Sequence, residues 1–415
     1  MRNFGAIKLL LLANFISGVA QGISMISIPL YFANQNQSNW FNIIYTIITL
    51  ISLFWSLYGG TLIDKFNRKK IFLVLNITNG ITIGLIAFIE SSTSGYTNYL
   101  AATVFALTFF NYNLHYPCFY AFMQEITEKE NYNKIASYIE VQSQLASAFA
   151  GAGAALLIGG GISLSYFNIE VEPWTLSEIF ALDACTYFIA FFIIFVIRYV
   201  PLANRTVEAG SVLFRLRVGY NYLKNHPYVF LFGVVTHSVF VVVLLHVFNL
   251  APVYVTQHLK ASSETYAISE IFYALGAIVA GISVHRIFKK MTFVKAIIIM
   301  TLISVLEFVF MICSTWISVF YIMTFLLGLT NAGIRVIRVS YLFKVLPNQI
   351  MGRANSIFFL SNALSRIVFL CIFSLAFFHH SGNVIYSFMI LSVFMFITVV
   401  VLMIYYSEIA LNKKQ

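Results

Sequence analysis

Four single carboxylates stand inside long apolar stretches of the sequence: Glu140, Asp183, Glu270 and Glu307. A carboxyl group in such surroundings loses much of the water that stabilises its charge, so it can bind and release a proton as its access to water changes. A proton-coupled carrier requires this chemistry. Three alternatives remain: Glu140 can pair with Lys134 near a surface, Glu270 can lie at an outer rim, and Asp183 is expected to pair within the fold.

Three arginines also interrupt apolar stretches. Arg335 and Arg338 are three positions apart and therefore share one face of a helix, and Arg366 stands in the next stretch. Charges inside hydrocarbon are costly and usually face a protein interior or water. These cations predict a cavity that favours an anionic or zwitterionic substrate. Alternatively, Arg335 and Arg338 reach the membrane surface beside Lys344. Arg366 lies deeper and is the better candidate for a functional charge.

Neutral polar residues extend this candidate cavity. They lie in the first and fourth apolar stretches: Asn14, Gln21, Ser24, Asn111, Asn113 and His115. A buried histidine is more often a hydrogen-bonded packing residue than a proton relay. The sequence contains no metal-ligand spacing, disulfide framework, phosphate-binding glycine loop or nucleophile–base constellation. We therefore expect no metal, no cofactor and no enzymatic activity.

The elements that must position these residues are twelve apolar runs. Each is long enough to cross about 30 Å of hydrocarbon as a helix, and helix is the only spanning form that satisfies the backbone of a single run. The predicted spans are 7–33, 41–63, 71–90, 97–124, 134–162, 177–199, 227–256, 265–288, 292–313, 316–345, 352–378 and 383–407.

The composition agrees with a protein that lies in a membrane. The chain of 415 residues is 60% hydrophobic and 10% charged, whereas soluble domains carry about 25% charged residues. The net charge of +10 would suggest a nucleic-acid partner in a soluble protein. Here the cations fall in short loops and at span ends, apart from the three arginines above and Lys260. This asymmetry predicts a bilayer as partner, no nucleic acid, and both termini in the cytoplasm.

A basic turn between the second and third spans occurs again in the second half of the sequence at one constant offset. Gly60, Asp64, Lys65, Arg68 and Lys69 match Gly281, His285, Arg286, Lys289 and Lys290. Parallel repeats are typical of transporters in which one helix bundle moves against another. We therefore predict a six-helix bundle over 1–200, a cytoplasmic linker with an interfacial helix over 201–226, and a second six-helix bundle over 227–415.

Together these motifs resemble the major facilitator superfamily, and within it the bacterial drug-exporter branch that includes macrolide-efflux proteins. The residues that carry the resemblance are the turn from Gly60 to Lys69, Leu114–Pro117, Phe180–Ala184, Gly219–Pro227 and Gly352–Arg353. The resemblance covers the whole chain and implies an all-α membrane fold of twelve helices in two pseudo-symmetric halves. It also implies that spans five and eight line the cavity, which makes Glu140 and Glu270 the preferred proton carriers.

The resemblance further implies a conformational latch at the basic turn. The Asp64 carboxylate would accept hydrogen bonds from the N-terminus of span eleven and hold one conformation shut. The remaining members of this latch would be Gly60, Lys65, Arg68, Lys69, Arg286, Gly352 and Arg353. The alternative is that these cations only hold the turn at the lipid headgroups.

The sequence departs from the exporter pattern at two spans. Gln21 stands where an aspartate is frequent in span one, and the small-residue run Ser147–Ala155 lacks the proline of the exporters' span five. Small residues at these positions also permit close helix approach.

We expect a monomeric secondary transporter of the bacterial inner membrane that exports a small amphipathic or anionic molecule with the proton gradient. Two alternatives remain. One is a transporter or flippase for anionic lipids or lysophospholipids on the same fold, and the other is a membrane receptor or assembly partner that moves no substrate.

Overall fold

The computed structural model describes residues 3–93, 95–128, 131–159, 161–164, 167–170, 172–200, 212–288, 290–379 and 382–411. Within these ranges the side chains of some residues are not described, and they are named below where they matter. The chain divides into two compact units. The first comprises Met1–Gln35 and Ile47–Ala209, and the second comprises Asn36–Thr46 and Gly210–Gln415. The beginning of the predicted second span thus groups with the second unit, whereas the sequence placed it in 1–200.

The predicted all-helical membrane fold is confirmed. Among the described residues, eleven helices are long and apolar enough to cross a membrane. The helix of the predicted fourth span, Thr97–Ile126, has 30 residues but is not one of these eleven. It carries the polar residues Asn111, Asn113 and His115 in its middle. Eleven apolar helices and this more polar one correspond to the twelve predicted spans.

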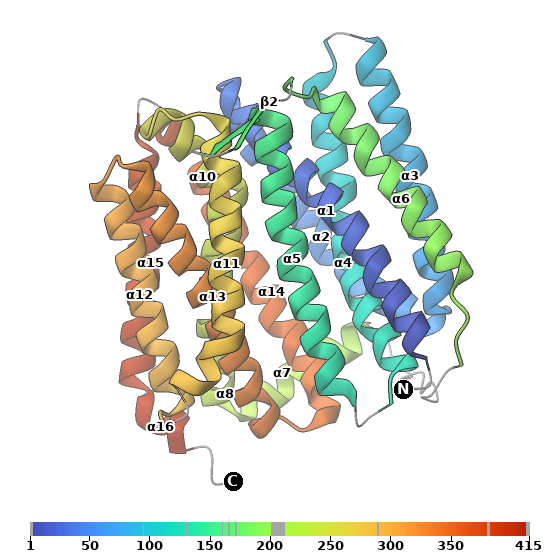
Figure 1. The fold of residues 1–415 in the computed structure, drawn as a ribbon. Coiled ribbons are helices and arrows are strands. Elements are labelled where there is room, and N and C mark those ends of the chain that lie inside the picture. The colour runs from blue at the N-terminus through green and yellow to red at the C-terminus, as the bar shows by residue number, and fades with distance from the viewer. Residues whose placement is uncertain are drawn as a thin grey trace. The chain divides into compact units, whose positions relative to one another are not determined.

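The first unit consists of long helices and one hairpin (Figure 1). The helices are α1 (Phe4–Asn34), α2 (Ser38–Lys65), α3 (Arg68–Ser92), α4 (Thr97–Ile126), α5 (Tyr132–Gly159) and α6 (Leu176–Val196). Helix α3 packs along α6, and α1 packs on α4, α5 and α6. Local sequence fixes two helix starts. Asn67 caps α3 by accepting the Lys70 amide over 3.2 Å, and Thr175 forms a capping box with Glu178 at the start of α6.

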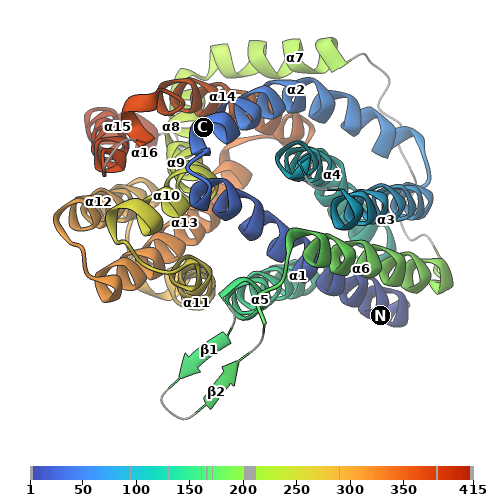
Figure 2. The same cartoon turned by 90° about the horizontal axis from the view of Figure 1, so that it is seen from above.

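The hairpin was not predicted from the sequence. Strands β1 (Gly161–Leu164) and β2 (Phe167–Glu170) pair antiparallel, with Gly161 opposite Glu170. Figure 2 shows them beyond the end of α5. The sequence extended the fifth span to residue 162, but three successive glycines begin at Gly159. Glycine is costly in a helix, so α5 ends there and the β-branched Ile162 and Ile169 form the hairpin instead.

Helices α1 and α5 approach each other closely because the residues at their crossing are small. A Cβ atom added to Gly22 would lie 2.6 Å from the Cβ atom of Ala150, and one added to Gly153 would lie 2.7 Å from the side chain of Ile23. Neither distance leaves room for a methyl group. The predicted packing role of the small-residue run in span five is therefore confirmed.

Apart from Asn36–Thr46, the first helix of the second unit is α7 (Val212–Asn225), which packs on α14 and lies beside it in Figure 2. Residues 201–211 of the predicted linker lie outside the described residues. The unit continues with α8 (Pro227–Thr236), α9 (Ser238–Leu245), η2 (His246–Leu250), α10 (Ala251–Val253), η3 (Tyr254–His258), α11 (Ser263–Ile287), α12 (Phe293–Cys313), α13 (Ile317–Val345), α14 (Asn348–Phe373), η4 (Ala376–His379), α15 (Val384–Ile404) and α16 (Tyr406–Leu411).

The predicted seventh span is an interrupted helix. It breaks at His237 and contains two π-helical turns, η2 and η3, on either side of Pro252. Proline has no backbone N–H and its ring collides with the carbonyl one turn earlier, so a regular α-helix cannot pass through it unchanged. Such π turns are frequent at functional sites.

Glycines also bring α11 and α13 together in the second unit. A Cβ atom on Gly276 would collide with the backbone of Phe325, and one on Gly328 would collide with the backbone of Tyr273. The two helices therefore cross backbone to backbone. Beside this crossing, the Asn331 amide donates to the Tyr273 hydroxyl over 2.6 Å.

Candidate functional site

A buried polar chain links three helices of the first unit. The Asn14 amide on α1 donates to Gln142 Oε1 on α5 over 2.7 Å, and its Oδ1 lies 2.7 Å from His115 Nε2 on α4. Because Asn14 Oδ1 is an acceptor only, His115 donates through Nε2. Its ring also packs edge-on against Phe72 at 5.0 Å. The structure thus brings two predicted residues together and adds Gln142, which the sequence analysis missed.

A second chain centres on the hydroxyl of Tyr187 on α6. Gln21 Nε2 donates to this oxygen over 2.7 Å and Asn111 Nδ2 donates to it over 3.1 Å. Tyr187 was also missed from the sequence. It stands four residues after Asp183, on the same face of α6, and this spacing was the available signal. Two more predicted residues, Gln21 and Asn111, therefore meet at one tyrosine.

Asp183 lies beside this second chain and is fully buried. No described cation pairs with its carboxylate, and the hydroxyl of Ser24 on α1 is the hydrogen-bonding group recorded beside it. The expected pairing of Asp183 within the fold is therefore limited, in the described part of the chain, to this neutral hydroxyl. Its helix positions it among neutral groups.

The arginines of the second unit are held inside it. Arg338 is only 8% exposed, and its Nη1 donates to the backbone carbonyl of Thr236 over 3.0 Å. That carbonyl lies at the break between α8 and α9. Arg366 is 3% exposed and lies over the ring of Tyr45, 5.8 Å from its centroid. Arg335 is half-buried and within electrostatic range of Arg338. The Arg338 side chain is therefore buried in the second unit and does not extend to the protein surface.

The two preferred proton carriers are described unequally. Glu270 is half-buried on α11, near Tyr266, whose hydroxyl donates to the carbonyl of Val247 in η2 over 2.7 Å. The side chain of Glu140 lies outside the described residues. Glu307 on α12 is fully buried, and its Oε1 accepts from the Thr330 hydroxyl over 3.4 Å. The proton-carrier roles of Glu140 and Glu270 stay predictions.

Two cations of the basic turn bind within their own unit. Arg68 Nη1 lies 2.9 Å from Glu125 Oε2 on α4 and 2.8 Å from the carbonyl of Ala121. Lys69 Nζ donates to the carbonyls of Phe195 and Ile197 at the end of α6 over 2.9 and 2.8 Å. These contacts hold α4 and α6 at the start of α3.

Most of the other residues of the predicted latch are not described, so the latch stays a prediction. The side chains of Asp64, Lys65 and Arg286 and the surroundings of Gly60 and Gly352 are not described. Arg353 is half-buried at the start of α14, where its backbone carbonyl meets the face of α7 at Gly219.

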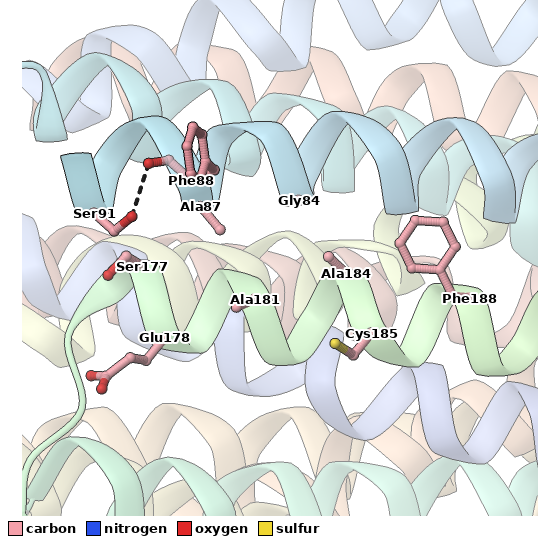
Figure 3. A pocket seen from close by; sticks show the side chains of 10 residues that line it. All are labelled: Gly84, Ala87, Phe88, Ser91, Ser177, Glu178, Ala181, Ala184, Cys185 and Phe188. Carbon is pink, nitrogen blue, oxygen red and sulfur yellow. Dashed lines mark hydrogen bonds between the residues drawn. The ribbon is translucent and has the colours of Figure 1, made fainter. Parts of the chain in front are cut away.

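A pocket of about 400 Å³ lies between α3 and α6 in the first unit (Figure 3). Small residues line its middle, the ring of Phe88 lies near the end that holds Ser91, and the ring of Phe188 lies at the opposite end. Ser91, Ser177 and Glu178 lie at one end. None of the predicted cavity residues lines this pocket.

The comparisons with known proteins identify the family. The profile of the major facilitator superfamily matches residues 10–370. The chain belongs to the major facilitator superfamily. This membership confirms a membrane transport protein without enzymatic activity as the broad class. No curated protein matches the chain significantly, and the drug-efflux branch within the superfamily is not established.

Solved structures of this superfamily fold superpose on nearly the whole chain at low identity. The nucleoside transporter NupG is 10% identical with a TM-score of 0.70, over 97% of this chain and 99% of that one. A D-xylose–proton symporter is 11% identical with a TM-score of 0.69, over 97% of both chains. A bacterial homologue of the iron transporter ferroportin is 13% identical with a TM-score of 0.66, over 96% of this chain and 100% of that one. At such identities the likeness establishes the fold alone.

Proposed function

We propose that this member of the superfamily is a secondary active transporter that exports a small anionic or amphipathic molecule in exchange for protons. The observation that carries the anionic preference is the environment of Arg338. Its guanidinium is buried and is held by a neutral carbonyl, with Arg335 within electrostatic range. A buried cation whose described partner is neutral keeps its full charge, and a charge inside a membrane protein is generally retained for function.

The direction and the location of the protein rest on the sequence. Export follows from the resemblance to the drug-exporter branch, and the distribution of lysine and arginine supports cytoplasmic termini in a bacterial inner membrane. The protein would bind its substrate as a monomer, with Arg366 as a second cation of the same unit.

The test begins with a ligand screen of purified protein by thermal shift, using anionic siderophore-like compounds, cationic drugs and anionic lysophospholipids as the probes. We expect the anionic soluble compounds to raise the melting temperature. Stabilisation by lysophospholipids alone would favour the lipid-transport alternative instead. Stabilisation by cations only would overturn the anionic preference.

Arg338→Met then separates charge from packing in the same screen. This variant should lose at least tenfold in affinity for the anionic compound, because it removes the charge but keeps an apolar side chain of similar length. Lys344→Met is the matched control on the same helix, since Lys344 is exposed and stacks on Phe293 at 4.7 Å. Equal affinity of the Arg338 variant and the control would contradict the proposed role of Arg338.

A further inference from the structure

The groups around Asp183 on α6 carry no compensating cation. Helix α1 contributes the neutral Ser24 and Gln21, and α4 contributes Asn111 and the hydroxyl of Tyr112. The titratable groups within electrostatic range of the carboxylate are Tyr112 and Tyr187. Helix α3 also packs on α6, and its recorded contacts near Asp183 are those of the uncharged Gly80 and Gly84. An ionised carboxylate in this position is neither solvated nor paired.

The hydrogen bonds of the same cluster do not balance. Tyr187 already accepts two donors, from Gln21 and Asn111. Oδ1 of Asn111 lacks a donor among the described residues, and the hydrogen-bonding group recorded beside the Asp183 carboxylate there is the hydroxyl of Ser24. The hydroxyls of Ser24 and Tyr187 can each still donate one hydrogen bond, whereas Oδ1 of Asn111 can only accept. Protonation of Asp183 removes the unsolvated charge and adds one O–H donor to a cluster in which Oδ1 of Asn111 lacks a donor.

We propose that Asp183 is a proton-binding site of the first unit. This inference rests on the proposed proton-coupled transport and assigns a proton site that differs from Glu140 and Glu270. In the step, one carboxylate oxygen takes a proton from water on one side of the membrane. The same O–H bond breaks when the site gains access to water on the other side, and no other bond changes. Ser24, Asn111 and Tyr187 are positioning residues that offer hydrogen bonds to the protonated form.

The test reads the protonation state directly and needs no substrate. Infrared difference spectra of purified wild-type protein in lipid vesicles would be recorded during a pH titration, in H2O and in D2O. We expect a carboxylic-acid C=O band that shifts in D2O and disappears in Asp183→Asn. Glu307→Gln is the matched control, because Glu307 is a buried carboxylate of the second unit bonded to Thr330. This variant should keep the Asp183 band.

Two variants of the neighbouring hydroxyls and the addition of sodium ions test the proton site further. Tyr187→Phe and Ser24→Ala should shift the frequency or the midpoint of the band without abolishing it, because they alter hydrogen bonds to a proton that is still bound. An identical set of bands in wild type and Asp183→Asn would overturn the proposal. Loss of the wild-type band on addition of NaCl, but not of choline chloride, would replace it with a sodium site. The infrared measurement does not depend on flux, so failure of the proton-site proposal can be distinguished from failure of the transport proposal.

Discussion

Asn14 connects His115 to Gln142 through two hydrogen bonds of 2.7 Å each, and so ties α1 to both α4 and α5. One amide side chain uses its donor and its acceptor on different helices. Removing it would leave a buried imidazole N–H and a glutamine oxygen without partners. A single substitution of Asn14 should therefore disturb the packing of the first unit.

We predict that Asn14→Ala lowers the free energy of unfolding by about 1–3 kcal/mol, the cost of leaving buried polar groups unsatisfied. The measurement is thermal or denaturant unfolding of the purified protein in detergent. Asn113→Ala is the control, because the Asn113 amide donates to the Phe109 carbonyl of its own helix and to no other helix among the described residues. If both variants unfold alike, the link through Asn14 does not stabilise the unit.

The ion pair between Arg68 and Glu125 predicts a measurable coupling energy. The Arg68 and Glu125 side chains are 17% and 7% exposed, so the pair is more buried than a surface salt bridge but is not fully buried. Glu125→Gln should cost about 1–2 kcal/mol of unfolding free energy, and the double variant with Arg68→Gln should cost less than the sum of the two single variants.

The control for this cycle is Lys70→Gln, since Lys70 is an exposed cation in the same turn. It should change stability by less than about 0.5 kcal/mol. Strict additivity of Arg68→Gln and Glu125→Gln would show that the two side chains do not interact in the folded protein.

The crossing of α11 and α13 predicts that added methyl groups are not tolerated there. Gly276→Ala and Gly328→Ala each place a Cβ atom against a backbone of the other helix, so the helices must separate, at a cost of at least about 1–3 kcal/mol. Gly281→Ala is the matched control on α11, because a Cβ atom there meets nothing within 4 Å. The yield of folded protein and its melting temperature measure the effect. Equal behaviour of all three variants would contradict the close crossing.

The hydroxyl of Tyr254 predicts a smaller effect at the second π turn. It donates to the carbonyl of Met311 over 2.7 Å and lies 3.1 Å from that of Ser314, at the end of α12. Tyr254→Phe should cost about 1 kcal/mol, since one hydrogen bond is lost and the ring remains packed. The rate of backbone hydrogen exchange at the end of α12 should rise in this variant. An unchanged rate would show that the Tyr254 hydroxyl does not anchor the end of α12.

The membrane fold could be predicted from the sequence because apolar runs and basic loops follow directly from the bilayer. The polar residues Asn14, Gln21, Asn111 and His115 were also identifiable, since they interrupt apolar helices. Their partners were not, because Gln142 and Tyr187 resemble ordinary residues of an interface or a membrane surface until the helices are packed.

Other features depend on packing or on local backbone geometry. The isolation of Asp183 follows from which neighbours surround it, and no pattern in the sequence gives that. The sequence shows Pro252 inside the predicted seventh span. Whether this proline kinks the helix or widens it into π turns depends on the tertiary contacts on either side. The assignment of Asn36–Thr46 to the second unit depends on contacts such as the Asn42 amide with the Phe373 carbonyl at 3.4 Å.

The proposed activity of the protein is the transport of an anionic compound by means of a proton gradient. The most direct measurement is the flux of the best anionic compound from the thermal-shift screen in proteoliposomes with an imposed pH difference. We predict transport against the concentration gradient of the compound that stops when a protonophore collapses the pH difference. Flux that is unchanged by the protonophore, or no flux under any gradient, would contradict this account.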